Sequence, residues 1–221
     1  YCVIQIAAGA QHCLSILSSS TYTGSITQVV SWGTGANGQL GVIGAPSSHV
    51  PLLVPISISP SDTVVSITCG ENHSLALTRA GAIFSWGINN RGQCGIESRG
   101  EAVLIPILVQ LPSQAVFTHI VCGRDTSFAI DETGRLFSWG SGDNGKLGHG
   151  DLNDQIIPRQ VSSLMNRDGD PLEICGIGCG EFFTVAADSQ GQCLYWGHNH
   201  LIPTVLACFQ GQRIVDVACG K

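Results

Sequence analysis

The feature that most constrains the fold of this chain is an internal repeat marked by its four tryptophans. Each tryptophan is followed by glycine, and the four stand at Trp32, Trp86, Trp139 and Trp196. The repeat length is therefore about 55 residues. A regular period of this length is typical of a fold in which copies of one structural unit are stacked or arranged in a ring.

Two further marks fix the register of the repeat. The first precedes each tryptophan and reads Ala-Gly in the first copy and Cys-Gly in the later ones, at Ala8, Cys69, Cys122, Cys179 and Cys219. The second is a glycine-rich turn after the tryptophan, over residues 33–41, 87–95 and 140–148. The fourth copy lacks this turn, because residues 198–201 lead almost directly to Pro203.

The segments between these marks have the character of short strands. In the second copy, apolar and β-branched residues alternate or cluster over residues 64–69, 74–78 and 83–86, and a fourth strand is expected near residues 105–110. No segment of ten or more residues has a helical period. Four strands in each repeat are typical of a β-propeller blade, so the sequence predicts an all-β propeller. The expected blades are residues 1–60, 61–115, 116–172 and 173–213, with the start of a fifth at 214–221.

The repeat signature can be compared with known families. The second copy reads Cys-Gly-x-x-His-Ser-Leu-Ala-Leu-Thr from Cys69, and then Gly-x-Ile-Phe-Ser-Trp-Gly-x-Asn-x-x-Gly-Gln from Gly81. The third copy departs from it at Thr126 and the fourth at Phe183, where the second has His73. This pattern resembles the repeat of the regulator of chromosome condensation family. The resemblance implies a ring of seven blades, so we expect this chain to form an incomplete part of such a ring.

The composition of the chain limits which class of partner it is expected to bind and in which compartment it is expected to work. The formal net charge is −6, which argues against binding to naked nucleic acid, because that function needs clustered Lys and Arg. Ten cysteines are spread along the chain instead of forming close pairs, which favours free thiols and an intracellular location, in the nucleus or cytoplasm. Residues 1–61 contain no Asp, Glu, Lys or Arg, but polar residues and prolines interrupt every apolar run, so no membrane span is predicted.

The sequence predicts no catalytic residue, no cofactor and no metal site. Residues 33–38 match a phosphate-binding G-x-G-x-x-G pattern, but that pattern should open a helix, and here a strand is expected. The residues that could be imagined as zinc ligands are Cys175, Cys179, Cys193, His198 and His200. They lack the two C-x-x-C pairs of a structural zinc site. His12 and His73 occupy one repeat position and are expected to form hydrogen bonds within their blades.

Blade geometry selects the candidate binding residues. When four strands run up and down, the turn between the first and second strands (A–B) and the turn between the third and fourth (C–D) lie at the same end. The candidates on the A–B turns are Gln11, Glu71, Asn72, Arg124, Asp125, Glu181 and Phe182. Those on the C–D turns are Asn90, Arg91, Asp143, Lys146, His149 and Asp151, next to a charged segment at residues 97–101.

We therefore expect a scaffold that is not an enzyme and that binds a protein partner through its blade-end loops. The family resemblance implies an alternative, guanine-nucleotide exchange on a Ran-type small GTPase, which is the activity of the founding family member. The open edges of an incomplete ring also suggest self-association.

Overall fold

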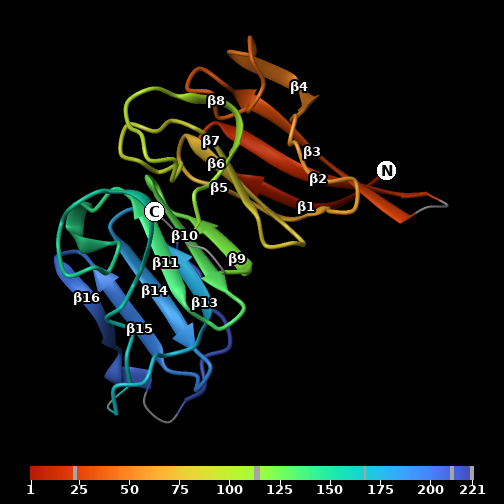
Figure 1. The fold of residues 1–221 in the computed structure, drawn as a ribbon. Helices are drawn as coiled ribbons and strands as arrows, with labels where there is room; N and C mark the ends of the chain where they lie inside the picture. The colour runs from red at the N-terminus through yellow and green to blue at the C-terminus, as the bar shows by residue number, and fades with distance from the viewer. Residues whose placement is uncertain (22–23, 112–114, 167, 210–211, 220–221) are drawn as a thin grey trace.

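The fold is described from a computed structural model over residues 1–21, 24–111, 115–166, 168–209 and 212–219. Its strands form four antiparallel sheets of four strands each, joined in sequence order within each sheet (Figure 1). The first sheet contains β1 (Cys2–Ala8), β2 (His12–Thr21), β3 (Gly24–Thr34) and β4 (Ser47–Leu53). The second contains β5 (Val64–Cys69), β6 (His73–Thr78), β7 (Ile83–Gly87) and β8 (Val103–Leu108).

The third and fourth sheets repeat this plan. The third contains β9 (Phe117–Cys122), β10 (Thr126–Asp131), β11 (Leu136–Gly140) and β12 (Gln155–Gln160). The fourth contains β13 (Ile174–Cys179), β14 (Phe183–Asp188), β15 (Cys193–Gly197) and β16 (His200–Val205). The helical segments in the described ranges are two single 3₁₀ turns, η1 (Asp143–Gly145) and η2 (Ala207–Phe209). None of the described helices could span a membrane.

The predicted all-β propeller architecture is confirmed, and the strand limits differ only in detail. The first three strands of the second blade lie within one residue of the predicted limits. The fourth begins and ends two residues earlier than expected, because Val103 already pairs with Gly87 and Leu108 pairs with Phe84. The pairing of β7 with β8 shifts its register between Ser85 and Gly87, and this shift allows Val103 to pair with Gly87.

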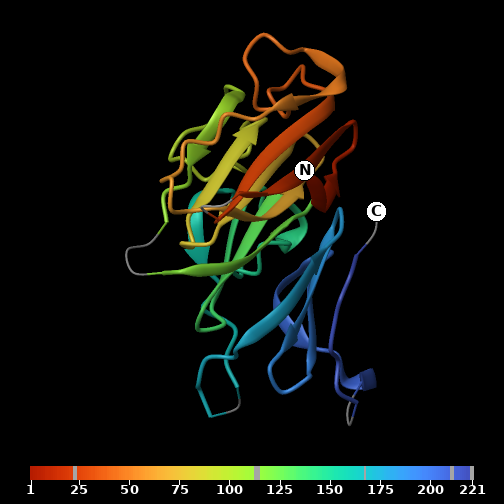
Figure 2. The ribbon, with the colours of Figure 1, turned by 90° about the vertical axis from the view of Figure 1, so that its right-hand side faces the viewer.

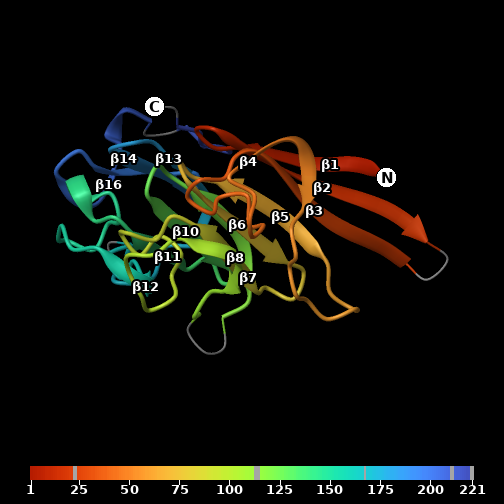
Figure 3. The same cartoon turned by 90° about the horizontal axis from the view of Figure 1, so that it is seen from above.

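The four sheets follow one another along an arc, and their first strands, β1, β5, β9 and β13, contact each other in that order. Seen from above, the first and fourth sheets lie at opposite ends of the molecule (Figure 3). Three clusters of apolar side chains fill the spaces between adjacent sheets. Trp86, Trp139 and Trp196 are fully buried in these clusters, whereas Trp32 of the first sheet is only partly buried.

The chain after η2 runs back along the fourth sheet (Figure 2). The N–H of Ile214 donates to the carbonyl of Gly191 at 2.9 Å, and Ala218 lies against Gly178 of β13. This segment occupies the position beside β13 where a fifth blade would follow. Residues 212–219 form no strand.

Candidate binding face

The segment that begins with the Ala-Gly or Cys-Gly mark forms the A–B turn of each blade. In the second blade the N–H of Gly70 donates to the carbonyl of His73 at 2.9 Å, which closes the turn. A Cβ on Gly70 would lie 2.1 Å from Cε1 of the His73 ring, so only glycine allows the ring to lie over the turn. The two residues between them project at the blade end, and these are the residues that vary from blade to blade.

The repeat histidines connect neighbouring blades. Nε2 of His12 lies 3.0 Å from Oγ of Ser74, and that hydroxyl donates to the carbonyl of Gln39 at 3.1 Å. His73 makes the same 3.0 Å contact with Ser127 of the third blade. The predicted hydrogen bonds within the blade are therefore wrong: each histidine side chain donates to the serine of the next blade.

Burial keeps these two histidines neutral. It lowers the pKa of His12 to about 4 and the pKa of His73 to about 3, because a charged imidazole would lose its water. Nδ1 of each ring is buried and has no partner among the described residues. A second proton on either ring would thus be a buried donor without an acceptor.

An arginine joins the A–B turns of three consecutive blades. Nε of Arg124 lies 2.5 Å from Oε2 of Glu71 in the preceding blade, and its Nη1 pairs with the carboxylate of Glu181 in the following blade. Asp125 is also close, at 3.6 Å from Nε of Arg124. The hydrogen bond to Glu71 and the nearby carboxylates raise the pKa of Arg124. We call Glu71, Arg124 and Glu181 the mouth ladder.

The mouth ladder borders a central cavity of about 590 Å³. Equivalent residues of all four blades and the chain after η2 line this cavity, at positions 8–10, 69–71, 122–124, 179–181 and 219. Burial raises the pKa of Cys69 to about 12 and that of Cys122 and Cys179 well above the usual value. The thiols of the cavity wall are therefore protonated and poor nucleophiles.

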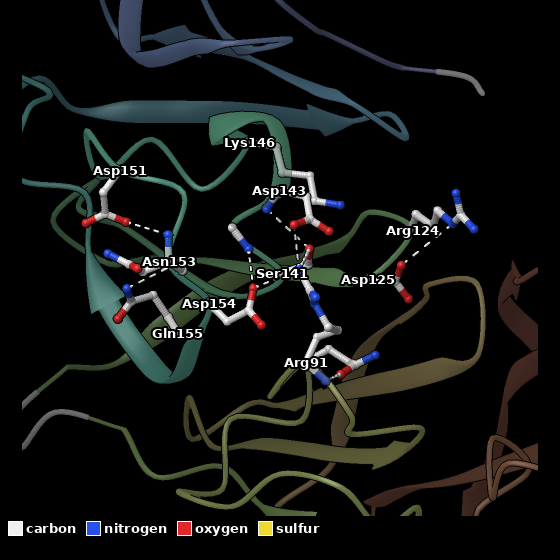
Figure 4. Close-up of polar contacts among 12 residues, drawn as sticks. Arg91, Arg124, Asp125, Ser141, Asp143, Lys146, Asp151, Asn153, Asp154 and Gln155 are labelled. Carbon is white, nitrogen blue, oxygen red and sulfur yellow. Dashed lines mark hydrogen bonds and ion pairs between the residues drawn. The ribbon is translucent and has the colours of Figure 1, made fainter.

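A second charged group joins the C–D turns of the second and third blades (Figure 4). Nη2 of Arg91 lies 2.6 Å from Oδ1 of Asp143, 3.1 Å from Oδ1 of Asp154 and 3.2 Å from Oγ of Ser141. Arg99 adds an ion pair of 3.3 Å to Oδ2 of Asp154. We call these five residues the cross-turn cluster.

Asp154 is the centre of the cross-turn cluster, and the sequence prediction missed it. Its side chain is only 10% exposed, and it also accepts a hydrogen bond of 2.9 Å from the N–H of Gly142. The residue follows the repeat turn and has no counterpart in the repeat signature. The sequence feature that could have pointed to Asp154 was the charged segment at 97–101 in the preceding blade, because its Arg99 needs an acidic partner.

Lys146 and Asp125 lie between the two groups and are less accessible than the sequence indicated. Lys146 is only 4% exposed, and its Nζ lies 3.5 Å from the carbonyl of Glu181. Burial lowers the pKa of Lys146 and raises the pKa of Asp125. In Figure 4 the side chain of Lys146 lies above Asp143, and that of Arg91 lies below it.

Three of the remaining candidate binding residues accept hydrogen bonds from other residues of the chain. Asn72 accepts a hydrogen bond of 3.4 Å from Gln39 of the first blade. Asn90 accepts one of 3.1 Å from Gln93 within its own turn. Gln11 is exposed on the first A–B turn, and its carbonyl accepts from the N–H of Thr34 at 2.7 Å.

Two C–D candidates lie outside both charged groups. Nε2 of His149 lies 2.9 Å from Oγ of Ser138, and burial lowers the pKa of His149 to about 4. Asp151 pairs at 3.7 Å with Arg159 of β12. The predicted face therefore has a connected part, formed by the mouth ladder and the cross-turn cluster, and a peripheral part.

One exposed aromatic residue extends the connected part. Phe182 follows Glu181 on the A–B turn of the fourth blade and is 44% exposed. The face thus combines paired charges with an apolar side chain. Within the described ranges, no group of His, Cys, Asp and Glu could hold a metal ion, and all ten cysteines are free thiols.

These features define a region of a repeat β-propeller with a charged face at one end of its blades. Comparison with known proteins identifies the repeat. The family described as "Regulator of chromosome condensation (RCC1) repeat" matches residues 28–77, 80–130 and 133–187. The chain belongs to this family.

Similar proteins of known sequence are larger than this chain. The E3 ubiquitin-protein ligase HERC2 of Homo sapiens is 32% identical over 214 residues, covering 88% of this chain and 4% of the ligase. The ultraviolet-B receptor UVR8 of Arabidopsis thaliana is 29% identical over 228 residues, covering 98% of this chain and 48% of the receptor. The chain thus spans about half the length of the receptor and a small part of the ligase.

Solved structures confirm the fold. Human WBSCR16 has a TM-score of 0.84 at 22% identity, with 99% of this chain and 58% of that chain covered. Prp20p from Saccharomyces cerevisiae has a TM-score of 0.79 at 25% identity, with 100% and 54% covered. The Prp20p structure is described together with its binding properties to Gsp1p and histones.

Proposed function

We propose that this chain is a protein-binding propeller region that holds its partner with the A–B and C–D turns. The observation that carries the proposal is the joining of charged residues across blade borders at one end of the blades, in the mouth ladder and the cross-turn cluster. Loops held by a rigid scaffold are frequent sites of recognition. The binding of Gsp1p and histones by the similar Prp20p supports a protein as the partner class.

The chemistry of the face suits a partner with both polar and apolar contacts. The side chains of Arg124, Glu71 and Glu181 are 44%, 27% and 26% exposed, so each can pair with a partner while the ladder fixes its position. Phe182 offers an aromatic anchor beside them, and aromatic residues with Arg are enriched among the residues that dominate binding energy. Electrostatic pairing at such a face sets specificity and the rate of association.

The test is a variant with Glu71, Arg91, Arg124 and Asp143 all changed to Ala. We expect at least a tenfold loss of affinity for Gsp1p or histones, used as purified probes, and loss of the same partners from quantitative affinity capture. Circular dichroism and the unfolding temperature would show that the variant is folded.

The matched control changes exposed charges at the other end of the blades. Arg79 and Glu132 lie on the turns between the second and third strands and are exposed. The double variant Arg79→Ala and Glu132→Ala should keep every interaction of the unchanged chain. Equal binding by the four-residue variant and the unchanged chain would reject this face.

A second candidate function is guanine-nucleotide exchange on a Ran-type small GTPase. It is favoured by the similarity to Prp20p, whose structure is described with its binding to Gsp1p. The measurement is the release rate of a fluorescent guanine nucleotide from Gsp1p with and without this chain. A tenfold or greater acceleration would support exchange, and an unchanged rate would reject it while leaving the binding function in place.

We also propose that the chain works inside the cell, in the nucleus or the cytoplasm. Its ten free thiols support this, because cysteines that lie close to one another in an oxidising compartment tend to form disulfides. Fluorescence microscopy of the tagged full-length protein would test the location, and secretion into the medium would contradict it.

A further inference from the structure

The turn between β14 and β15 contains a buried carboxylate with one unpaired oxygen. Oδ1 of Asp188 accepts hydrogen bonds of 3.0 and 2.8 Å from the N–H groups of Gln190 and Gln192. Its Oδ2 is buried and has no hydrogen-bond partner among the described residues. The whole residue is only 1% exposed. Buried carboxylate oxygens in folded proteins are nearly always paired, so this exception needs a specific cause.

The corresponding turn of the third blade shows which partner such a carboxylate takes. Oδ1 of Asp131 accepts hydrogen bonds from the N–H groups of Thr133 and Arg135 at 3.0 and 2.9 Å, as in the fourth blade. Its Oδ2 lies 2.6 Å from both Nε and Nη2 of the Arg135 guanidinium. Two-point contacts of this kind are the geometry that arginine and carboxylate groups favour.

The two turns share one backbone conformation and differ in the residue that would supply the cation. The N–H of Asp131 donates to the carbonyl of Arg135 at 3.1 Å, and the N–H of Asp188 donates to that of Gln192 at the same distance. Gln192 therefore stands where Arg135 stands, but its side chain carries no charge. The fourth blade thus has the carboxylate of this pair without its guanidinium.

A cavity of about 880 Å³ lies against the turn of the fourth blade. Gln190, Gly191 and Gln192 form part of its wall, together with Leu194 of β15. The loop after β12 and the chain after β16 complete the wall, at the end of the fourth sheet that lies lowest in Figure 1. Because the N–H groups of Gln190 and Gln192 bind Asp188, its carboxylate lies directly behind this wall.

The loop after β12 is an insertion in the repeat, since it is longer than the connections after β4 and β8. Met165 and Pro171 pair across it and form a short hairpin beside the cavity. Met165 is 45% exposed, and Val205 and Phe209, which also line the cavity, are 48% and 38% exposed. Insertions within one copy of a repeat often belong to a binding face.

We propose that this cavity binds an arginine side chain of a protein partner, whose guanidinium pairs with Oδ2 of Asp188. The guanidinium takes the place that the head group of Arg135 has in the third blade. There Cζ of Arg135 lies 6.0 Å from the centre of the Phe137 ring, and Leu194 of the cavity wall has the equivalent strand position. Apolar side chains of the wall can cover the methylene groups of the arginine. The site lies at the opposite end of the blades from the mouth ladder and the cross-turn cluster, and does not depend on them.

The chain's own arginine beside the cavity has a different place. A Cβ on Gly191 would lie 2.5 Å from Cγ of Arg213, and Arg213 forms no ion pair within the described ranges. In the third blade Glu173 lies against Gly134 in the same way. Arg213 is therefore the counterpart of Glu173 and not of Arg135.

The test is an NMR titration of the isotope-labelled chain with N-acetyl-arginine amide. We expect saturable shifts of the amide signals of Gln190 and Gln192, because their N–H groups bind the carboxylate that the probe approaches. N-acetyl-citrulline amide has a similar shape without the charge, and it should bind at least about tenfold more weakly. Equal shifts with the two probes, or no shift with either, would overturn the proposal.

Three variants locate the binding. Asp188→Asn keeps an acceptor for the turn but removes the charge, and should weaken binding at least about tenfold. Gln192→Arg restores the pair of the third blade within the chain and should block binding to the same extent. Asp168→Asn is the matched control, because Asp168 also lines the cavity but is exposed, and it should leave the affinity within about twofold.

Unfolding temperatures would show that each variant is folded. If Asp188→Asn does not fold, Gln192→Arg decides the question, since this change is made at an exposed side chain. Unchanged binding by Gln192→Arg would overturn the proposal, and so would equal losses in Asp168→Asn and Asp188→Asn. Binding that appears only after Arg213→Gln would show that the chain's own arginine fills the site, which would also overturn it.

Discussion

Acidification from pH 7.5 to pH 5.0 is expected to destabilise the fold through His12 and His73. Burial lowers their pKa values to about 4 and about 3, whereas an unfolded histidine has a pKa of about 6.5. Between these values the unfolded chain binds a proton that the folded chain does not. The contribution of the two neutral histidines to the free energy of unfolding is thus fully present above pH 6.5. It falls as the pH drops below 6.5, and it continues to fall until the pH reaches the pKa of each histidine in the folded chain.

The size of the expected destabilisation follows from the number of protons that the unfolded chain binds and the folded chain does not. One such histidine lowers the free energy of unfolding by about 1.4 kcal/mol for each pH unit below about 6.5. At pH 5.0 this amounts to about 2 kcal/mol for each of the two residues, or about 4 kcal/mol together. Typical domains are stable by about 5–15 kcal/mol, so this loss is large. Burial lowers the pKa of His149 to about 4 as well, so this residue adds to the loss in the same direction.

The assay is urea denaturation followed by tryptophan fluorescence at several pH values between 7.5 and 5.0. The matched variant is His73→Gln, which keeps a donor towards Ser127 and cannot be protonated. It should reduce the slope of unfolding free energy against pH by about 1.4 kcal/mol per unit. Asp62 and Asp131 do not interfere, since their lowered pKa values place their titration below this window. Stability that is independent of pH, or an equal slope in the variant, would refute the reasoning.

Two further comparisons test the packing. Gly70→Ala should lower the free energy of unfolding by about 3 kcal/mol, because its Cβ meets both the His73 ring and a backbone oxygen. Gly176→Ala, with no atom closer than 3.8 Å, should lower it by under about 1 kcal/mol in urea denaturation. Equal losses would contradict this account of the turn. Trp139→Phe should cost about 1–3 kcal/mol through its lost hydrogen bond and volume, while Trp32→Phe should cost under about 0.5 kcal/mol. Similar losses in these two variants would show that the hydrogen bond from the Trp139 ring to the carbonyl of Gln93 contributes little.

The amino-acid sequence by itself determined the blade. Trp-Gly and Cys-Gly at a constant spacing fixed the repeat, and short apolar segments between them fixed four strands in each copy. These features depend on local chain geometry: strand alternation, tight turns at glycine and the close approach that Gly70 allows. They could therefore be predicted without knowing how one blade sits on the next.

Only the tertiary structure decided which residues meet across blade borders. His73 was expected to bond within its blade and instead reaches Ser127, 54 residues further along the chain. Asp154 went unnoticed although it joins two turns, and Lys146 is buried although its residue type and turn position suggested exposure. Such contacts depend on the angle and distance between neighbouring sheets, which many packed side chains set together, and no local pattern in the sequence encodes them.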